Sequence, residues 1–593
     1  MGEIVEINGP IAIIRLPSVL TGEQVRVGKL NLVGEVIGRE EDLAIVQIYE
    51  TTDGLRPGEQ AEALGHPLSV ELGPGLLSQI YDGVQRPLED VLAISGDRIA
   101  RGLEVPSLSR DRKWRFQPSS TQAVGNRLQG GEVLGSVQET SAIAHRILVP
   151  PEVKGELIDL APAGDYTIEE TAARVRDAQG MVHKLRFYQR WPVRIPRPYR
   201  RRDHAVLPLV TGQRILDTFF PLLKGGKAAI PGPFGAGKTV LQHQIARWCN
   251  AQIVIYVGCG ERGNELVDVL ETMPLIMDPH TGKPLMERTM LVANTSNMPV
   301  VAREASVYVG ITLAEYFRDQ GYDVVMVADS TSRWAEALRE VAGRLGQMPV
   351  EEGYPAYLAS KLSAFYERAG RVETLAGDHG SVTLIGAVSP PGGDFSEPVT
   401  SHTKEIIQTF WALSKELADA RHFPSVDWNE SFSGYVSIAA RWWAENVDST
   451  WAAKRAEALA LLAQAEELAR IVNLVGMEAL SPEQRWALEG ASLIKEGVLA
   501  QSALDPVDSF CSPQKQFLLL DLVLEIYHQG ADMLRLGVPV QQLIALPLLS
   551  RARRIKMQVK SENADELKKV IGEVRDVFGH MRVEYARPEG AAA

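Results

Sequence analysis

The sequence predicts a multidomain α/β protein, because its pattern of apolar residues changes twice along the 593 residues. Short β-type runs broken by glycines come first, strand-length runs then alternate with helix-length segments, and helical spacing dominates the last part. Strand–helix alternation is typical of a parallel sheet covered by helices. A chain of this length has room for about four domains.

The first pattern predicts a small antiparallel β-barrel over residues 1–70. Runs such as "IAIIRL", "EQVRV" and "LVGEVIGRE" are short and closely spaced, as strands of such barrels are. A second β-rich, glycine-rich stretch over residues 116–190 ends at the proline-rich connector "WPVRIPRPYRR". We interpret this stretch as an inserted β-rich bulge domain.

The middle pattern predicts the parallel sheet. We expect strands at residues 228–230, 253–257, 290–293, 324–328 and 382–388. Residues 71–115 and 191–436 are assigned to this α/β domain, and "REASVYVGITLAEYFRDQG" is an example of its helices. Residues 437–593 are assigned to a helical C-terminal domain, because "WAAKRAEALALLAQAEELARIVNLVG" has apolar residues at helical spacing. Its end, residues 588–593, is expected to be a frayed tail.

Composition and charge narrow the class of protein. Apolar residues make up 45% and charged residues 23% of the chain, as in ordinary globular proteins. A net charge of −13 argues against attraction to anionic membranes or nucleic acid. The N-terminus lacks a signal-peptide pattern, and no apolar run approaches the roughly 18 residues of a membrane span. The three cysteines have no C-x-x-C spacing, which predicts buried thiols in a reducing cytoplasm.

A glycine-rich loop between an expected strand and an expected helix indicates a phosphate site. The string "GPFGAGKT", residues 232–239, fits the pattern G-x-x-x-x-G-K-[ST]. Glycines let the backbone curl so that its N–H groups point at phosphate oxygens, and the helix N-terminus adds a favourable dipole. Lys238 is expected to reach the β- and γ-phosphates, and the Thr239 hydroxyl to bind Mg²⁺. The alternative is a glycine turn with an exposed lysine.

Two acidic residues complete the predicted chemistry. The string "YDVVMVADS" is an apolar strand that ends in Asp329, the pattern of a carboxylate that serves the metal. Ligands of parallel sheets bind at the carboxyl ends of strands, which favours this role over the alternative of a helix cap. Glu261 in "IVIYVGCGERGNE" follows another strand and is the candidate for orienting the attacking water, with Arg262 bracing its carboxylate. The alternative for Glu261 is a surface acid.

The chain resembles the catalytic A subunit, or alpha chain, of prokaryotic V-type and A-type rotary ATPases over essentially its whole length. The strings that carry the resemblance are "ELGPGLLSQIYDGVQRPLE", "IPGPFGAGKTV", "YVGCGERGNE", "NTSNMPVVAREASVY", "ADSTSRWAEALRE", "EEGYPAYL", "SPPGGDFSEPVT" and "RHFPSVDW". The resemblance implies that the α/β domain is a RecA-like P-loop nucleotide-binding domain. The inserted bulge argues against the F-type beta subunit, which lacks it, and the intact phosphate loop argues against the non-catalytic subunit.

The resemblance also implies residue roles. Catalytic roles fall on Lys238, Glu261 and Arg262, and Mg²⁺ with ATP or ADP is the expected cofactor, held through Thr239 and Asp329. The adenine of relatives lies between two aromatics, of which one matches Phe423 and the other falls at Leu504, where no aromatic stands. Either nucleotide affinity is weaker for this reason, or Phe510 compensates. The nucleotide-binding set is Gly232, Pro233, Phe234, Gly235, Ala236, Gly237, Lys238, Thr239, Val240, Phe423 and Leu504.

The partners follow from the same resemblance. It implies an alternating hexameric ring with a non-catalytic B subunit that supplies an arginine finger in trans, together with central and peripheral stalk subunits. Through the stalks the ring is coupled to a membrane sector that moves H⁺ or Na⁺, and ATP is hydrolysed or synthesised. The expected location is the cytoplasmic side of the membrane, peripheral to it, with no nucleic acid bound.

Two other classes share parts of this pattern. A RecA-like motor on nucleic acid has the same loop and strand order, but the acidic balance of this chain argues against it. A non-enzymatic binding protein is disfavoured because Lys238, Glu261 and Asp329 are all present.

Overall fold

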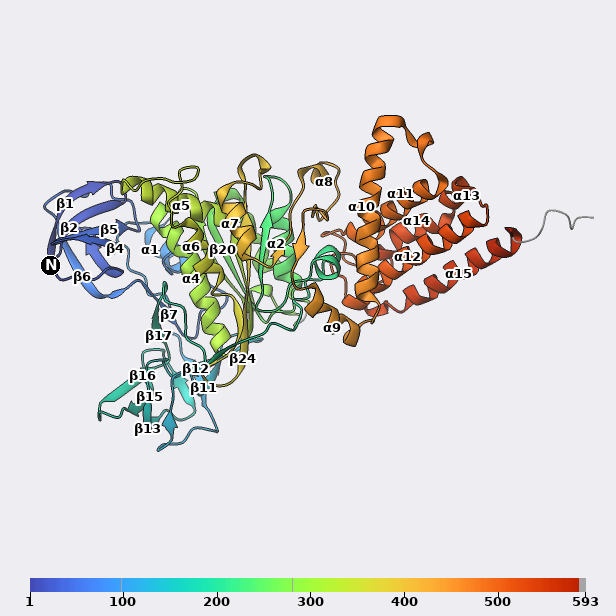
Figure 1. Ribbon diagram of the computed structural model, residues 1–593. Helices are drawn as coiled ribbons and strands as arrows, with labels where there is room; N and C mark the ends of the chain where they lie inside the picture. The colour runs from blue at the N-terminus through green and yellow to red at the C-terminus, as the bar shows by residue number, and fades with distance from the viewer. Residues whose placement is uncertain (97–98, 280, 586–593) are drawn as a thin grey trace, which may run out of the picture. The chain divides into compact units, whose positions relative to one another are not determined.

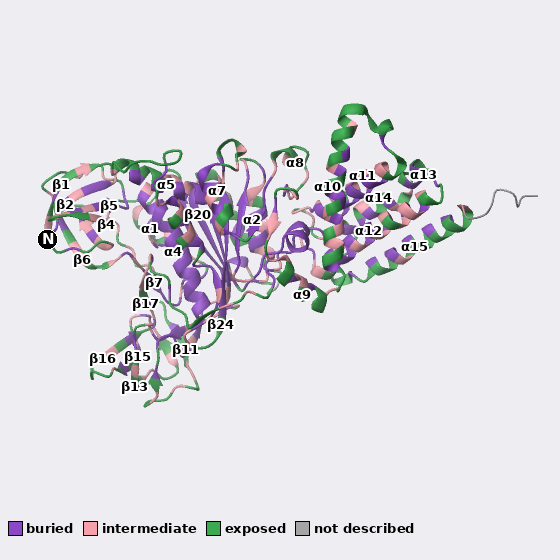
Figure 2. Ribbon diagram, in the orientation of Figure 1, coloured by how far each residue is buried: buried purple, intermediate pink, exposed green. Residues whose placement is uncertain are grey.

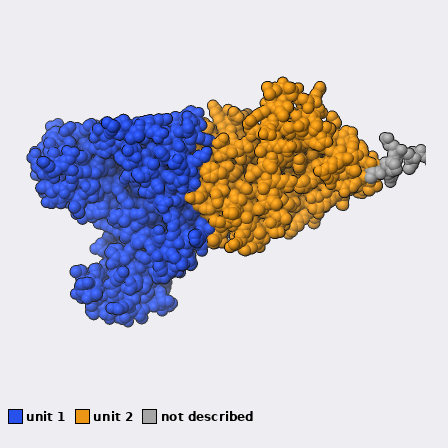
Figure 3. All heavy atoms as spheres, in the orientation of Figure 1, with its two compact units in different colours: residues 1–205, 224–229, 251–407 blue, residues 206–223, 230–250, 408–593 orange. Residues whose placement is uncertain are grey.

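The structure is a computed structural model that describes residues 1–96, 99–279 and 281–585 (Figure 1). The tail expected at residues 588–593 lies outside the described residues. The chain divides into two compact units (Figure 3). Unit 1 comprises Met1–Ala205, Lys224–Ala229 and Ala251–Ile407, and unit 2 comprises Val206–Leu223, Ile230–Asn250 and Gln408–Ala593.

The N-terminal part of unit 1 is a closed antiparallel barrel, as predicted, with strand order β1-β2-β5-β4-β3-β6. Alternate side chains of its strands, such as Ile14, Val25, Val36 and Val46, point inward and form a common apolar core. The strands are β1 (Gly2–Asn8), β2 (Ile11–Arg15), β3 (Glu23–Val27), β4 (Leu32–Glu40), β5 (Leu43–Ile48) and β6 (Gln60–Pro67).

The inserted domain of unit 1 is β-rich, as predicted, and contains two four-stranded sheets of order β10-β13-β15-β16 and β12-β11-β9-β14. Its chain leaves and returns through paired strands, because β7 (Ser69–Leu72) lies antiparallel to β17 (Gln189–Pro192). The other strands are β9 (Trp114–Pro118), β10 (Arg127–Leu128), β11 (Val133–Gln138), β12 (Ala144–Leu148), β13 (Gly155–Leu160), β14 (Gly164–Tyr166), β15 (Thr171–Arg176) and β16 (Val182–Arg186).

The predicted parallel sheet forms the core of unit 1. Neighbouring strands run β24-β22-β20-β21-β8, and every pair in this series is parallel. These strands are almost continuously apolar, as expected for a sheet buried on both faces. Their bounds are β8 (Ile80–Tyr81), β20 (Ile253–Glu261), β21 (Thr289–Thr295), β22 (Asp323–Asp329) and β24 (His379–Val388), and the short β18 (Arg201–Asp203) and β23 (Gly370–Glu373) pair beside β24. Strand β19 (Lys227–Pro231) follows β24 in the sheet order.

Helices cover this sheet. Helix α4 (Val300–Asp319) packs against β20, β21, β22 and β24, and nearly all of its residues are buried (Figure 2). Helix α5 (Thr331–Arg344) begins directly after β22, and its N-cap is Ser330, whose side chain accepts a hydrogen bond from the Arg333 backbone. The remaining helices of unit 1 are α1 (Leu88–Ser95), α3 (Gly263–Thr272), α6 (Leu358–Tyr366) and α7 (Pro398–Ile406), with short turns η2 (Met273–Leu275), η3 (Leu285–Arg288) and η4 (Pro391–Gly393).

Unit 2 contains helix α2 and the helical C-terminal part, which confirms the predicted helical domain. Helices α10, α11 and α12 pack on one another, and α15 packs along α12. The elements are the π-helical turn η1 (Ile215–Phe219), α2 (Lys238–Trp248), β25 (Thr409–Phe410), α8 (Lys415–Asp419), β26 (Phe432–Ser433), α9 (Val436–Asn446), α10 (Trp451–Val475), η5 (Met477–Ala479), α11 (Pro482–Ile494), the π-helical turn η6 (Lys495–Leu499), α12 (Pro513–Arg535), α13 (Val540–Ile544), α14 (Pro547–Arg554), η7 (Ile555–Met557), η8 (Ser561–Asn563) and α15 (Glu566–Tyr585).

Candidate functional site

The glycine-rich loop joins the end of β19 to the start of α2. Gly237 is the N-cap of α2 and has φ of 84°, a left-handed conformation that glycine adopts without steric cost. Lys238 begins the helix, and its Nζ donates a hydrogen bond of 2.8 Å to the carbonyl of Gly232 at the start of the loop. The lysine side chain therefore folds back over the loop. The N–H groups of the first turn of α2 point toward the same N-terminal end of the helix.

Close packing fixes the back of this loop. A Cβ atom at Gly232 would lie 2.7 Å from the side chain of Leu413, so a larger residue would displace the loop. The Leu413 N–H donates to the Pro231 carbonyl at 2.8 Å, and the Ser425 hydroxyl donates to the Ala236 carbonyl at 2.5 Å. These contacts hold the loop from both sides, while Phe234 and Gly235 remain exposed at its tip.

A cavity of about 470 Å³ opens beside the loop, within unit 2. The ring of Phe423 lies 3.5 Å from the position that a Cβ of Gly237 would occupy, so the ring packs against the end of the loop. Phe423 is 43% exposed and Leu504 is 96% exposed, and both line the cavity. The lining residues are Gln213, Gly237, Val240, Leu241, Gln244, Leu413, Arg421, Phe423, Pro424, Ser425, Ala500, Gln501, Ser502, Ala503, Leu504, Asp508, Lys556 and Met557.

Phe510 does not line this cavity. Its ring stacks on Trp248 at a centroid distance of 5.0 Å and an interplanar angle of 27°, and it lies against Gly212. The structure therefore gives no support to compensation by Phe510, and the second wall of the cavity remains that of Leu504.

Asp329 lies at the carboxyl end of β22 in unit 1 and is 4% exposed. Its Oδ2 accepts a hydrogen bond of 3.0 Å from the hydroxyl of Tyr256, a residue of the neighbouring strand β20. Burial, followed by the charges of Asp329 and Glu261, raises the pKa of Tyr256 well above its ordinary value. Both carboxylates therefore act on one buried hydroxyl. The N-cap of α5 is Ser330 and not Asp329, so this helix does not support the alternative in which Asp329 is a helix cap.

Glu261 is the last residue of β20, and Arg262 is the exposed N-cap of α3. The Glu261 carbonyl accepts a hydrogen bond of 2.8 Å from the Ser296 N–H, while the Arg303 guanidinium donates to the Ser296 carbonyl at 2.9 Å. The side chain of Arg303 also lies against Gly260, which has φ of 71°. These contacts fix the path of the backbone where it leaves the sheet at Glu261.

Arg333 is another cation near the Glu261 carboxylate. A Cβ at Gly260 would lie 2.9 Å from the Cβ of Arg333, and Arg333 donates to both oxygens of Glu336 at 2.7 and 2.9 Å. The hydrogen bond with Glu336, opposed by burial and helped by the charges of Glu336 and Glu261, raises the pKa of Arg333. The side chains of Glu261 and Arg333 therefore belong to one electrostatic environment.

The structure also brings residues to these places that the sequence analysis missed. One of them is Tyr256, which lies next to Asp329. The others come from separate parts of the chain and line the cavity: Gln244, Arg421 and Lys556. Arg421 stands two residues before Phe423 in "RHFP", which could have drawn attention to it. Nothing in the local sequence of Lys556 indicates a place beside this cavity.

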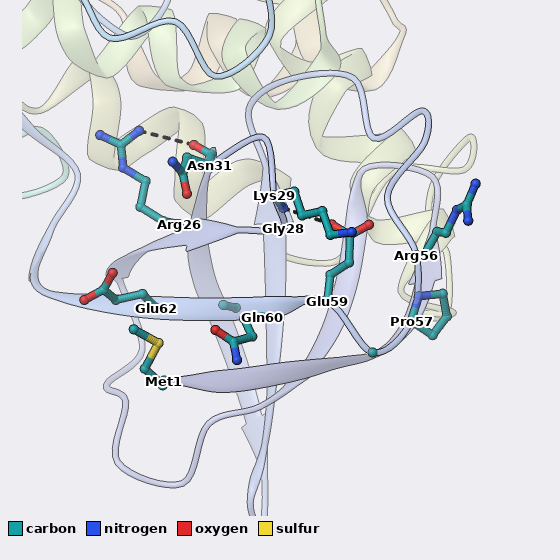
Figure 4. Close-up of a pocket in the computed structure, with 12 residues that line it drawn as sticks. Met1, Arg26, Gly28, Lys29, Asn31, Arg56, Pro57, Glu59, Gln60 and Glu62 are labelled. Carbon is teal, nitrogen blue, oxygen red and sulfur yellow. Dashed lines mark hydrogen bonds between the residues drawn. The ribbon is translucent and has the colours of Figure 1, made fainter.

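Another hollow lies in the barrel and has about 690 Å³ (Figure 4). Its lining combines charged residues such as Arg26, Lys29 and Glu59 with the apolar residues Met1, Pro57 and Ala61. None of the predicted site residues lines it. Among the residues that the structure describes, no group of three or more His, Cys, Asp or Glu side chains is arranged to hold a metal ion. No helix within the described ranges is long and apolar enough to cross a membrane.

All three cysteines are buried with free thiols, as predicted. Cys259 lies in β20, two residues before Glu261, and burial raises the pKa of its thiol to about 12. The thiol is therefore protonated at neutral pH and is no candidate nucleophile.

Comparison with known families gives a match for four regions of the chain. Residues 212–433 match the nucleotide-binding domain of the ATP synthase alpha/beta family, and residues 1–65 match its beta-barrel domain. Residues 105–194 match the barrel-sandwich domain of ATP synthase alpha/beta subunits, and residues 440–542 match the C-terminal domain of V and A type ATP synthases. The fold and the phosphate loop thus define a nucleotide-binding chain of the ATP synthase alpha/beta class.

Individual relatives narrow this class. The chain is 68% identical to the V-type ATP synthase alpha chain of Nitrosococcus oceani over 99% of both chains. It is 52% identical to the corresponding A subunit of the A-type ATP synthase of Desulfurococcus sp., over 99% of this chain and 100% of the relative. The chain therefore belongs to the family of V-type ATP synthase alpha chains and A-type ATP synthase A subunits.

A solved structure shares the fold at lower identity. The assembled ATPase EscN from the type III secretion system of enteropathogenic E. coli has a TM-score of 0.62 and 22% identity, and the match covers 88% of this chain and all of that one. The predicted fold class is confirmed by these matches together with the barrel and the parallel sheet.

Proposed function

We propose that this chain is the catalytic subunit of a rotary V-type or A-type ATPase, in which ATP hydrolysis or synthesis is coupled to rotation and to transmembrane H⁺ or Na⁺ transport. The observation that carries the proposal is a phosphate loop, with Lys238 bent over it, that opens beside a cavity lined by Phe423. A loop of this kind binds the phosphates of a nucleotide, and an apolar cavity beside it suits the base. The relatives described above are named as chains of V-type and A-type ATP synthases.

In the proposed reaction, Lys238 binds the β- and γ-phosphates and neutralises part of their charge. Glu261 accepts a hydrogen bond from the attacking water and orients it in line with the γ-phosphate. Arg262, the next residue, braces the Glu261 carboxylate. The buried backbone around Gly260 supports this role, because a fixed exit from β20 limits where the carboxylate can be.

Mg²⁺ is the metal that the family implies, and we propose that Asp329 and Thr239 would hold it. Asp329 offers a carboxylate that is 4% exposed at a strand end, and the Thr239 hydroxyl stands in the first turn of α2. Mg²⁺ is usually bound through one or two protein ligands together with substrate phosphates, so a dedicated protein cage is not required. When bound, the ion neutralises charge that develops on the phosphate oxygens. Tyr256 holds the Asp329 carboxylate in place for this task.

The base is proposed to lie in the cavity between Phe423 and Leu504. The half-exposed Phe423 ring offers a face for stacking, whereas Leu504 offers only an aliphatic contact. We therefore expect weaker base binding than in a site with two aromatics.

The proposed partners are a non-catalytic B subunit, central and peripheral stalk subunits and, through the stalks, a membrane ion-translocating sector. We propose that this chain lies on the cytoplasmic side of the membrane, peripheral to it. The chain is expected to need the B subunit for rapid ATP turnover, for a physical reason. The transition state spreads negative charge over the γ-oxygens, and an arginine finger commonly adds about 10³–10⁵ in rate. We propose that the B subunit supplies this finger.

The test compares the turnover of ATP by three preparations: the isolated chain, the ring assembled with the B subunit, and the ring assembled with a B variant that lacks the arginine. The expected result is a nearly silent isolated chain, an active ring and a ring without the arginine that is slower by at least about 10³-fold. Full activity of a verified monomer would contradict the finger in trans and direct attention to Arg333. Stimulation by RNA in place of the B subunit would favour a nucleic-acid motor.

A further inference from the structure

One wall of the cavity is a loop that connects η6 to α12. This segment, residues 500–512, contributes Ala500, Gln501, Ser502, Ala503, Leu504 and Asp508 to the lining. The segment that contains Phe423 forms another part of the lining. The two segments are joined directly, because the Gln501 N–H donates a hydrogen bond of 2.7 Å to the Phe423 carbonyl.

A buried arginine binds both the beginning and the far end of this loop. Arg214 precedes η1 and is fully buried, and its guanidinium binds three acceptors at once. Nε donates to the Val498 carbonyl at 2.6 Å, Nη2 to the Ala500 carbonyl at 2.7 Å, and Nη1 to Oδ1 of Asp508 at 2.7 Å. The planar fork of one side chain therefore joins the beginning of the loop to its far end.

Asp508 passes this constraint to the residues that face the cavity. Its second oxygen, Oδ2, accepts a hydrogen bond of 2.8 Å from the Ser502 N–H. The Ser502 hydroxyl in turn accepts from the Leu504 N–H at 3.3 Å. The position of Leu504, which is 96% exposed and has little packing of its own, thus depends on a chain of contacts that begins at Arg214.

Gln501 strengthens the same assembly. Its amide oxygen accepts from the Arg214 N–H at 2.8 Å, and its amide nitrogen donates to the carbonyls of Gly212 and Asp508 at 2.8 and 2.9 Å. Gln501 is 4% exposed, so these bonds are sheltered from water.

The electrostatics show that the pair is charged. Burial alone would raise the pKa of Asp508, but the charge and hydrogen bond of Arg214 outweigh it and leave this pKa below its ordinary value. The pKa of Arg214 is raised although burial opposes it, chiefly because of Asp508. A buried pair of this kind contributes little net stability compared with apolar residues, which suggests a role in geometry.

We infer that Arg214 and Asp508 are positioning residues that hold the loop over the cavity and thereby set the affinity for the base of the nucleotide, but not for its phosphates. This inference rests on the proposed function, since it assigns the cavity to the base. It makes the contribution of the base to binding depend on a pair of residues 294 positions apart in the sequence.

The test measures the equilibrium binding of two ligands, Mg-ATP and Mg-tripolyphosphate, which lacks base and ribose, by the full-length chain. Asp508→Asn keeps the size of the side chain, and Arg214→Lys keeps the charge but loses the fork. For each variant we expect ATP binding to weaken about tenfold, or about 1.4 kcal/mol, and tripolyphosphate binding to stay within about twofold. In the assembled ring, KM for ATP should rise with little change in kcat.

A further variant keeps the inference testable if Asp508→Asn and Arg214→Lys fold poorly. Ser502→Ala removes a hydroxyl that is not buried and creates no unpaired charge, and it should weaken ATP binding a few-fold without affecting tripolyphosphate. Hydrogen exchange at the Ser502 amide should be faster in Asp508→Asn than in the unmodified chain. Asp319→Asn is the control, because it alters another buried charge cluster, in which Asp319 pairs with both Arg197 and Arg318 in unit 1, and it should leave the ATP-to-tripolyphosphate ratio unchanged.

The outcomes separate this inference from the proposed function. Lys238→Ala should weaken both ligands; if it weakens neither, the phosphate loop is not the nucleotide site and the proposed function fails. If Lys238→Ala weakens both ligands while Asp508→Asn and Ser502→Ala change neither, or change both equally, the positioning role of Arg214 and Asp508 is refuted and the proposed function stands.

Discussion

Replacing Leu504 by phenylalanine should tighten the binding of ATP. Leu504 is 96% exposed and lines the same cavity as Phe423, so the larger side chain displaces no packed neighbour. It restores a second aromatic wall for the base. The change therefore adds a contact to the ligand while leaving the core of unit 2 as it is.

The magnitude follows from stacking energies. A stacked base contributes about 1–3 kcal/mol per aromatic side chain, and Leu504 already provides part of the apolar contact. We therefore expect a gain of about 1 kcal/mol, which is about a fivefold lower Kd for ATP. Because the side chain is exposed, the free energy of unfolding should change by less than about 0.5 kcal/mol.

The assay is equilibrium binding of Mg-ATP and Mg-tripolyphosphate to the unmodified chain and to Leu504→Phe. A matched control is Leu474→Phe, the same exchange at a leucine that is 85% exposed on α10 and does not line the cavity. Only Leu504→Phe should tighten ATP binding, and neither variant should change the affinity for tripolyphosphate. An unchanged Kd for ATP, or an equal gain for tripolyphosphate, would refute the placement of the base in this cavity.

Three further variants test other parts of the account. Lys238→Ala should abolish tight ATP binding in the assembled ring, because the γ-phosphate loses its paired cation, and unchanged affinity would exclude the loop as the nucleotide site. Asp329→Asn should shift the Mg²⁺ dependence of turnover to higher concentrations while leaving metal-free nucleotide binding nearly unchanged, and an unshifted titration would leave Asp329 with a structural role only. His422→Gln should remove an acid-sensitive contribution to stability. Burial, followed by the charges of Lys556 and Lys495, lowers the pKa of His422 to about 4. Because the unfolded chain takes up this proton near pH 6.5, stability falls by about 3 kcal/mol between pH 6.5 and pH 4, a loss that the variant should lack in pH-dependent unfolding. Equal pH profiles for both proteins would contradict this reason.

The parts of the site that the sequence predicts are those with a local signal. The phosphate loop needs glycines at fixed spacing before a helix, and Asp329 and Glu261 each end an apolar strand, so both features can be read from short strings. The strands of the parallel sheet were also predicted, because buried parallel strands are continuous apolar runs. Most of their ends lie one to several residues beyond the predicted limits, because hydrophobicity alone does not define where a strand ends; the start of β20 and the end of β24 are as predicted.

The parts that could not be predicted depend on side chains that meet across the fold. Arg214 and Asp508 are 294 positions apart, and neither has a neighbour in sequence that marks it as buried and paired. Phe510 was an open alternative for the base pocket, and only its stacking on Trp248 decides against it. Periodicity shows which residues are apolar, but it does not show which buried charges lie together.

Mg-ATP binding and turnover by the assembled ring carrying Glu261→Gln test whether Glu261 orients the attacking water. The amide keeps the size of the side chain but orients and polarises water poorly. We expect ATP affinity close to that of the unmodified ring and turnover lower by about 10²–10⁴-fold, the usual contribution of such a group. Turnover equal to that of the unmodified ring would contradict this role, because Glu261 would then be a structural acid at the end of β20.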